Sequence, residues 1–205
     1  MKLAVFGATG ATGRHLVQQA LQAGHEVTAL VRTPDALSNE NPRLTMVTGS
    51  IEHPAAVRRV VEGQDVVISV LGVRKGGSAT ICTDGVQAIL PAMAATDTQR
   101  LIALSAYGAL ETQDASLFIR FVRKVIADKM RDKDNMEISV RASDIEWTLV
   151  RPPVLTNGRH TGKYRSGVDL KVGMTGRISR ADLADFILRE AVRHEFVRQA
   201  PIVTA

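Results

Sequence analysis

Short apolar runs that alternate with helix-like segments narrow the possible folds of this 205-residue chain most strongly. Six runs are rich in Val, Ile and Leu, as buried strands are: Lys2 to Phe6, 26–31, 43–48, 65–71, 100–105 and 145–151. The segments between and after them have helical character: Arg14 to Ala23, 55–63, 83–97, Leu117 to Ala142 and 180–192. Strands that alternate with helices predict an α/β protein with a parallel sheet covered on both faces.

Single residues mark where this alternation is interrupted. We expect Gly24 to end the first helix and Pro91 to kink the third. Residues 156–177 break the rhythm, because they contain five glycines and five Lys or Arg against one Asp. This region is predicted to form loops and short strands, and Ser179 is expected to cap the helix that follows.

Composition and charge exclude several classes of protein. The chain is 45% apolar and 23% charged, which is ordinary for a globular protein, and no apolar run approaches the roughly 20 residues of a membrane span. Its net charge is +5, but the basic residues are scattered along the chain and there are only eight aromatic residues that could stack on bases. Neither nucleic acid nor a membrane is therefore expected as a partner. Cys82 is the single cysteine and is expected to be a small buried residue, and the five histidines show no metal-ligand spacing. A reducing, cytoplasmic location is the expectation.

Three glycines at regular spacing lie between the first strand and the first helix. Gly7, Gly10 and Gly13 are three residues apart, as in a turn that cradles the pyrophosphate of a dinucleotide. The N-terminus of the following helix adds partial positive charge, and the hydroxyls of Thr9 and Thr12 can donate to phosphate oxygens. We therefore predict a dinucleotide site at this turn.

An arginine at the end of the second strand suggests which dinucleotide binds. Binders of NAD carry an acidic residue at this position, whereas Arg32 suits the 2′-phosphate of NADP. Arg14, in the first helical turn, either adds charge there or is an ordinary solvated helix residue. The expected cofactor is NADP(H), with NAD(H) as the alternative.

Together these motifs resemble the atypical short-chain dehydrogenase/reductase proteins. The resemblance is greatest to the biliverdin reductase B and NADPH-dependent flavin reductase group, with the NmrA-like proteins as more distant relatives. It rests on FGATGATG, ALVR, VTGSI, SVLGVR, ALSAYG, ASDIEWTLVRPP and GRISRADLADFIL. It implies a Rossmann-like, doubly wound parallel sheet with a small C-terminal substrate-side lobe. Residues 1–205 would form one NAD(P)-binding domain, with 152–178 as substrate-side loops.

The resemblance also implies a role for individual residues. Those expected at the pyrophosphate and adenosine are Gly7, Thr9, Gly10, Ala11, Thr12, Gly13, Arg32, Ser50 and Ile51. Those expected at the ribose and nicotinamide are Leu71, Gly72, Val73, Arg74, Ser105, Lys133, Pro152 and Pro153. Lys133 is equally compatible with a solvated helix face. Tyr107 either stacks on an aromatic substrate, donates a phenol proton or simply packs.

The chain departs from the family pattern at four positions. Ser50 replaces an aspartate near the adenine, and Ala36 replaces a second arginine near the 2′-phosphate. Val154 stands where relatives have a histidine beside the substrate. The Tyr-x-x-x-Lys pair of ordinary dehydrogenases keeps its lysine, Lys133, but has Lys129 in place of the tyrosine.

These observations favour an NADPH-dependent reductase that passes a hydride to a planar conjugated acceptor, such as a flavin or a linear tetrapyrrole. Such an acceptor needs little acid from the protein, which fits the missing tyrosine. The basic loop 156–177 either meets an anionic acceptor or is an ordinary surface loop. Two alternatives remain: an NAD(P)-binding redox regulator without turnover, and a sugar-nucleotide epimerase or ketone reductase. The chain is expected to be a monomer or a weak homo-oligomer.

Overall fold

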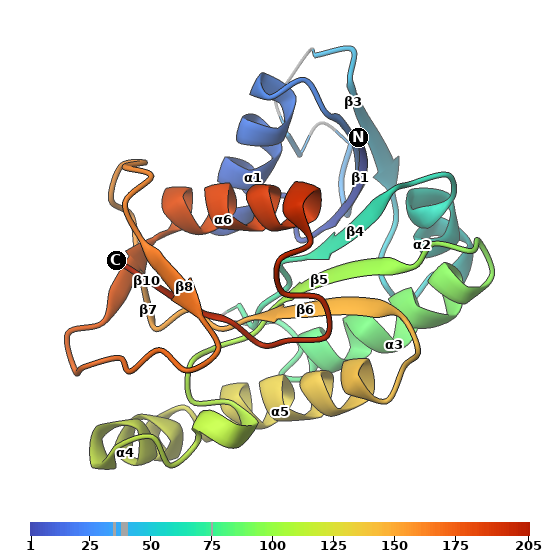
Figure 1. Cartoon of the computed structure of the whole chain (residues 1–205). Coiled ribbons are helices and arrows are strands. Elements are labelled where there is room, and N and C mark those ends of the chain that lie inside the picture. The colour runs from blue at the N-terminus through green and yellow to red at the C-terminus, as the bar shows by residue number, and fades with distance from the viewer. Residues whose placement is uncertain (35, 38–40, 75) are drawn as a thin grey trace.

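A six-stranded parallel sheet forms the centre of the computed structural model, which describes residues 1–34, 36–37, 41–74 and 76–205 (Figure 1). The strand order is β3-β2-β1-β4-β5-β6, so the direction of winding reverses between β1 and β4. The strands are β1 (Lys2–Phe6), β2 (Glu26–Val31), β3 (Leu44–Thr48), β4 (Val66–Ser69), β5 (Arg100–Leu104) and β6 (Glu146–Val150). In such sheets, ligands bind beyond the carboxyl ends of the strands at the point of reversal.

Helices cover both faces of the sheet, which explains why its central strands read as continuous apolar runs. Every residue of β4 and β5 is buried. On one face α1 (Ala11–Gln22) packs against α6 (Arg180–Arg193). The other face carries α2 (Pro54–Val61), α3 (Ile81–Ala94) and α5 (Ala127–Arg141) (Figure 1). The predicted Rossmann-like α/β fold is confirmed.

Three helix boundaries differ from the sequence prediction. α1 begins at Ala11 instead of Arg14, because Gly10 is its N-cap. α3 spans Ile81–Ala94 instead of the predicted 83–97, and Pro91 lies inside it as expected. The single helix predicted over 117–142 is wrong: α4 (Leu117–Val125) and α5 are separated at Ile126, whose φ of −115° and ψ of 39° lie outside the helical range.

Contacts made by α4 explain the break at Ile126. Arg123 donates a hydrogen bond from α4 to the carbonyl of Gly108 and forms a 2.6 Å ion pair with Asp134 on α5. These contacts fold α4 back toward α5 and the loop after β5, which a continuous helix could not do.

A small lobe of short strands follows β6. β7 (Val154–Thr156) pairs in parallel with β9 (Arg177–Ser179), and β8 (Arg165–Gly167) pairs antiparallel with β10 (Ile202–Thr204). The buried carboxylate of Asp182 on α6 accepts the backbone N–H groups of Thr161 and Gly162, which fastens the lobe to the sheet domain. β10 was not predicted. None of the helices in the described part of the chain has the length and apolar composition that a bilayer span requires.

Candidate dinucleotide and acceptor site

The turn after β1 has the backbone geometry that its glycines predict. Gly7 has a φ of +85°, and a Cβ at this position would lie 2.8 Å from the carbonyl oxygen of Val70. The N–H of Gly10 donates to the carbonyl of Gly7 at 2.9 Å, which closes the turn. Only glycine is accommodated at position 7, because both the positive φ and the close approach of Val70, directly after β4, exclude a side chain.

Gly10 and Gly13 have different surroundings. A Cβ on Gly13 would lie 2.1 Å from the carbonyl oxygen of Gly7, so α1 packs directly on the turn there. A Cβ on Gly10 would lie 3.1 Å from the same oxygen and 3.5 Å from Nη2 of Arg74. Gly13 therefore permits close packing of the helix, whereas a side chain at Gly10 would make a tight contact with the turn, without the severe overlap found at Gly13.

The N-terminus of α1 is suited to an anion. No side chain caps Gly10, and the first turn contains no acidic residue, so its N–H groups and partial positive charge are not neutralised locally. The guanidinium of Arg74 lies against the same turn and donates to the hydroxyl of Thr9 at 3.3 Å. The hydroxyl-bearing Thr12 is buried in the first turn, next to the exposed Ala11.

The N-terminus of α3 is not available in the same way. The buried carboxylate of Asp132 accepts the backbone N–H groups of Cys82 and Thr83, at 3.0 and 2.8 Å. The N-terminus of α3 is thus neutralised by the Asp132 side chain. The N-terminus of α1 has no such partner and lies near two cationic side chains, Arg14 and Arg74. The residues present at α1 fit a pyrophosphate.

The carboxyl ends of β2 and β3 carry the residues expected at the adenosine. Arg32 directly follows β2, is exposed, and forms no hydrogen bond or ion pair within the described residues. Arg14 reaches from α1 to the carbonyl of Ala36, in the loop that Arg32 opens, at 3.2 Å. The hydroxyl of Ser50 accepts the N–H of Glu52 at 3.1 Å, so it stabilises its own turn, and Ile51 is half-buried beside it.

Lys133 links the carboxyl ends of β4 and β5. Its ammonium group donates to the carbonyls of Leu71, at 3.2 Å, and Leu104. The thiol of Cys82 also donates to Leu71, and burial raises the pKa of Cys82 to about 11, so this thiol is neutral near pH 7. Gly72, the next residue, is exposed with open space around it.

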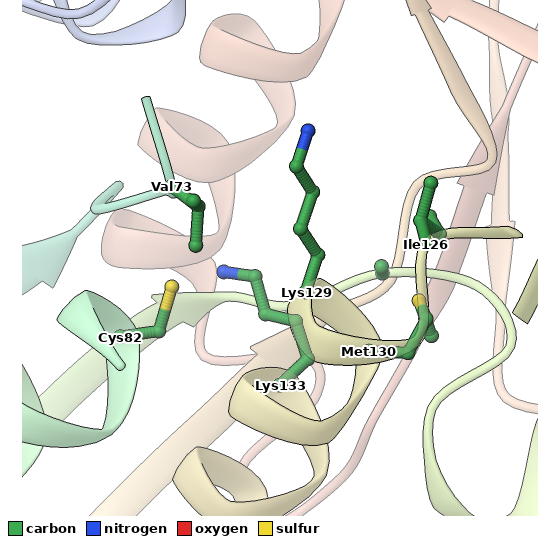
Figure 2. A pocket seen from close by; sticks show the side chains of 7 residues that line it. Val73, Cys82, Ile126, Lys129, Met130 and Lys133 are labelled. Atoms are coloured by element: carbon green, nitrogen blue, oxygen red, sulfur yellow. The ribbon is translucent and has the colours of Figure 1, made fainter. Parts of the chain in front are cut away.

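An apolar hollow of about 180 Å³ lies beside Lys133 (Figure 2). It is lined by Val73, Cys82, Ala106, Ile126, Lys129, Met130 and Lys133. Figure 2 shows Lys129 and Lys133 on successive turns of α5, with the Lys133 ammonium directed toward Val73 and Cys82 and that of Lys129 directed away from them. The hollow therefore joins the loop after β4 to the start of α5, at the end of the sheet where the nicotinamide is expected.

The hydroxyl of Ser105 is engaged in a buried network beneath this hollow. It donates to Oε1 of Glu137, and both residues are buried. Arg151 donates to both carboxylate oxygens of Glu137 and also pairs with Glu111. Burial alone would lower the pKa of Arg151, but the two carboxylates outweigh burial and raise it. In this conformation Ser105 points to Glu137, and its expected contact with the nicotinamide stays a prediction.

The remaining predicted residues lie along the loops after β5 and β6. The N–H of Tyr107 donates to the carbonyl of the buried Pro152, so these loops run side by side. Tyr107 is half-buried, and its hydroxyl has no partner among the described residues. Pro153 is half-buried, and Val154 lines a second hollow of about 270 Å³ in the C-terminal lobe.

Sequence reasoning missed two buried acidic residues of α5 that hydrogen-bond to the residues of the site. Glu137 is fully buried one helical turn after Lys133, and Asp132 is buried on the same helix. The i, i+4 spacing of Lys129, Lys133 and Glu137 was a signal, because it places all three on one face of α5. Nothing in the sequence indicated that Asp132 would cap α3, since the two segments are about 50 residues apart.

Comparison with known proteins settles the family. A family model described as NAD(P)H-binding matches residues 7–194. The chain belongs to this family. The cofactor is therefore NAD(P)(H), and the type of family expected from the sequence is confirmed.

Individual proteins resemble this chain in sequence or in fold. The chain is 24% identical over 200 residues to the uncharacterized protein YwnB of Bacillus subtilis and covers 92% of it. It is 32% identical over 158 residues to a ceramide reductase of Caulobacter vibrioides but spans 46% of that longer protein. Among solved structures, ChuY, an anaerobillin reductase from Escherichia coli O157:H7, superposes with a TM-score of 0.86 at 19% identity, over 99% of this chain and 96% of that one.

Proposed function

We propose that this protein is an NADPH-dependent reductase that transfers a hydride to a planar conjugated acceptor, such as a flavin or a linear tetrapyrrole. The observation that carries the proposal is which residues stand at the positions of the catalytic tyrosine, lysine and serine of ordinary dehydrogenases, and what they contact. Lys129 stands at the tyrosine position, and Lys133 is hydrogen-bonded to two backbone carbonyls. The hydroxyl of Ser105 is engaged with Glu137. The chain thus lacks the tyrosine that normally acts on alcohols and ketones at this place.

The choice of NADPH rests on cations at the adenosine end. Arg32 opens the loop after β2, and Arg14 reaches the carbonyl of Ala36 in the same loop. In this proposal, Arg14 supplies the charge of the second arginine that Ala36 replaces. Two guanidinium groups at this place favour a cofactor with a 2′-phosphate.

The choice of acceptor rests on the hollow at the other end. Val73, Ile126 and Met130 offer an apolar lining suited to the face of a conjugated ring, and Lys129 offers a cation to a carboxylate or phosphate substituent. Flavin phosphates and linear tetrapyrroles have both features. The name of ChuY, a tetrapyrrole reductase, supports this class of acceptor.

The contribution of the protein would be binding and orientation. Bound NADPH supplies the hydride, and the residues of the chain hold donor and acceptor in one geometry and limit access of water. Gly10 and the N–H groups of α1 would hold the pyrophosphate, and Val73 and Ala106, which line the hollow, would lie on the nicotinamide side. The proton that completes reduction comes from solvent, since the reduced acceptor does not need a protein acid.

An acceptor panel tests the proposal. NADPH consumption is measured with riboflavin, FMN and biliverdin, with small aliphatic ketones, and with no acceptor. We expect saturable consumption with the planar compounds and near-background consumption with the ketones. Lys129→Met should raise KM for FMN more than for riboflavin, because only FMN carries a phosphate. Tight NADPH binding without turnover of any acceptor would instead support the redox-regulator alternative.

A further inference from the structure

The outer face of α4 is apolar and uncovered. Its side chains Leu117, Phe118, Phe121 and Val125 are 81%, 37%, 65% and 67% exposed, and we call them the α4 face. They fall at positions i, i+1, i+4 and i+8 and therefore form one strip along the helix. Monomeric proteins rarely expose a contiguous strip of this kind without a function.

The helix is well fixed from its inner side, so the exposure is not a consequence of fraying. The hydroxyl of Ser116 caps it by accepting the N–H of Ile119 at 3.2 Å. A Cβ on Gly108 would lie 3.2 Å from a methyl group of Ile119, so the inner side packs on the loop after β5. The ion pair of Arg123 with Asp134 fixes it to α5. Figure 1 shows α4 projecting from the edge of the molecule.

Positive charge flanks the α4 face. Arg120 and Lys124 are exposed and lie one turn apart along one edge of the strip. α4 itself contains three cations and no acid. Asp114 lies 3.8 Å from Arg120, but both side chains are largely exposed, so this pair is weak in water.

We infer that α4 is a docking helix for an anionic lipid surface, with the α4 face in the acyl boundary and Arg120 and Lys124 at the headgroups. An apolar strip edged by Lys and Arg is the pattern of helices that lie in a membrane interface. Such a helix needs no membrane-spanning segment, and the inference departs from the expectation, drawn from composition, that a membrane is not a partner. Ile126, which directly follows α4, lines the hollow beside Lys133, so docking would place this hollow next to the lipid surface.

Other occupants fit the α4 face less well. A small acceptor in the hollow cannot cover it, because Leu117 and Val125 are about 12 Å apart along the helix axis. A second copy of this chain would bring the cations of both copies into one contact. Stable dimers also bury roughly 20–30 residues a side, far more than four side chains.

Vesicle sedimentation tests the inference. The purified protein is mixed with large vesicles of phosphatidylcholine alone, or of phosphatidylcholine with phosphatidylglycerol, and the bound fraction is measured. We expect binding to the anionic vesicles and at least tenfold weaker binding by the variant Leu117→Ser/Phe121→Ser. Arg120→Gln/Lys124→Gln should weaken binding about thirtyfold, since each cation near an anionic surface contributes roughly a fivefold gain.

Two controls separate this inference from trivial outcomes. Val192 on α6 is 57% exposed, so Val192→Ser removes a comparable apolar side chain elsewhere and should leave binding unchanged. Circular dichroism shows whether each variant is folded. The inference is overturned if the wild type binds neither kind of vesicle, or if Leu117→Ser/Phe121→Ser binds as well as the wild type. It is also overturned if sedimentation velocity shows a dimer that this variant dissociates.

Discussion

Gly10 and Gly13 are three residues apart, but substitution of Gly10 should abolish dinucleotide binding, whereas substitution of Gly13 should lower stability. Gly10 has a φ of −72° and a ψ of 166°, which any residue can adopt, and an added Cβ meets its nearest atom at 3.1 Å. At Gly13 the added Cβ would lie 2.1 Å from the carbonyl oxygen of Gly7 and 2.8 Å from the backbone of Ala8. We predict that Gly10→Val folds but does not bind dinucleotide, whereas Gly13→Ala loses stability.

The magnitudes follow from the contacts. A hydrogen bond to a charged group contributes about 1.5–3 kcal/mol. If the valine side chain at position 10 separates the pyrophosphate from two N–H donors, the loss is about 3–6 kcal/mol, or roughly 10²- to 10⁴-fold in Kd. For Gly13→Ala, overpacking costs about 1–3 kcal/mol. The gain in helix propensity, about 1 kcal/mol, is smaller, because a contact of 2.1 Å forces the backbone to shift.

Calorimetric titration with NADPH and urea unfolding measure the two effects separately. Gly10→Val should unfold near the wild-type urea midpoint with no detectable heat of binding. Gly13→Ala should unfold at a clearly lower midpoint, and its remaining folded fraction should bind NADPH. A folded Gly10→Val variant with normal NADPH affinity would show that the phosphates lie elsewhere, and a Gly13→Ala variant as stable as the wild type would refute the packing argument.

Three further predictions concern selectivity, chemistry and pH. Arg32→Ala should weaken NADPH binding about 10- to 150-fold relative to NADH, from 1.5–3 kcal/mol for one charged hydrogen bond, and Arg14→Ala should weaken it less; equal calorimetric affinities of the wild type for both cofactors would contradict this. Lys129→Tyr restores the tyrosine four residues before Lys133 and should raise the steady-state rate with small ketones at least tenfold, a fraction of the roughly 10²–10⁴ that a positioned acid contributes; an unchanged rate would mean that residue 129 lies too far from the acceptor. Burial alone would raise the pKa of Asp182, but hydrogen bonds from Thr161, Gly162 and Ser179 outweigh burial and lower this pKa below its ordinary value. The ionised Asp182 carboxylate therefore stabilises the fold above the ordinary pKa, and this stabilisation is lost as the pH falls through the lowered pKa. Asp182→Asn should therefore reduce the fall in the free energy of unfolding, measured in urea, as the pH is lowered. An unchanged dependence on acidic pH would mean that other carboxylates cause the loss of stability.

The sheet and the dinucleotide turn were predictable because their causes are local. A continuous apolar run such as 66–69 is buried on both faces and pairs in parallel wherever helices alternate with strands. The conformations of Gly7 and Gly13 follow from close backbone approach, which only glycine permits. The position of Arg32 at the end of the second strand followed from the strand pattern, and family resemblance added Lys133, whose ammonium group the structure places at the carboxyl edge of the sheet.

The supporting contacts were not predictable, because each joins segments far apart in the chain. The break at Ile126 depends on Arg123 reaching Gly108 and Asp134, and no Gly or Pro marks it in the sequence. The bond between Ser105 and Glu137 exists only once α5 lies beneath β5. The outward direction of the α4 face likewise depends on that break.

Anaerobic single turnover tests the central claim most directly. The complex of the protein with NADPH is mixed rapidly with riboflavin or FMN, and the absorbances of the nicotinamide and the flavin are followed together. The proposed function predicts that both disappear at one rate, in a one-to-one ratio, and faster than in free solution, while a ketone leaves the bound NADPH intact. Bound NADPH that persists in the presence of flavin, or that is consumed by the ketone instead, would contradict it.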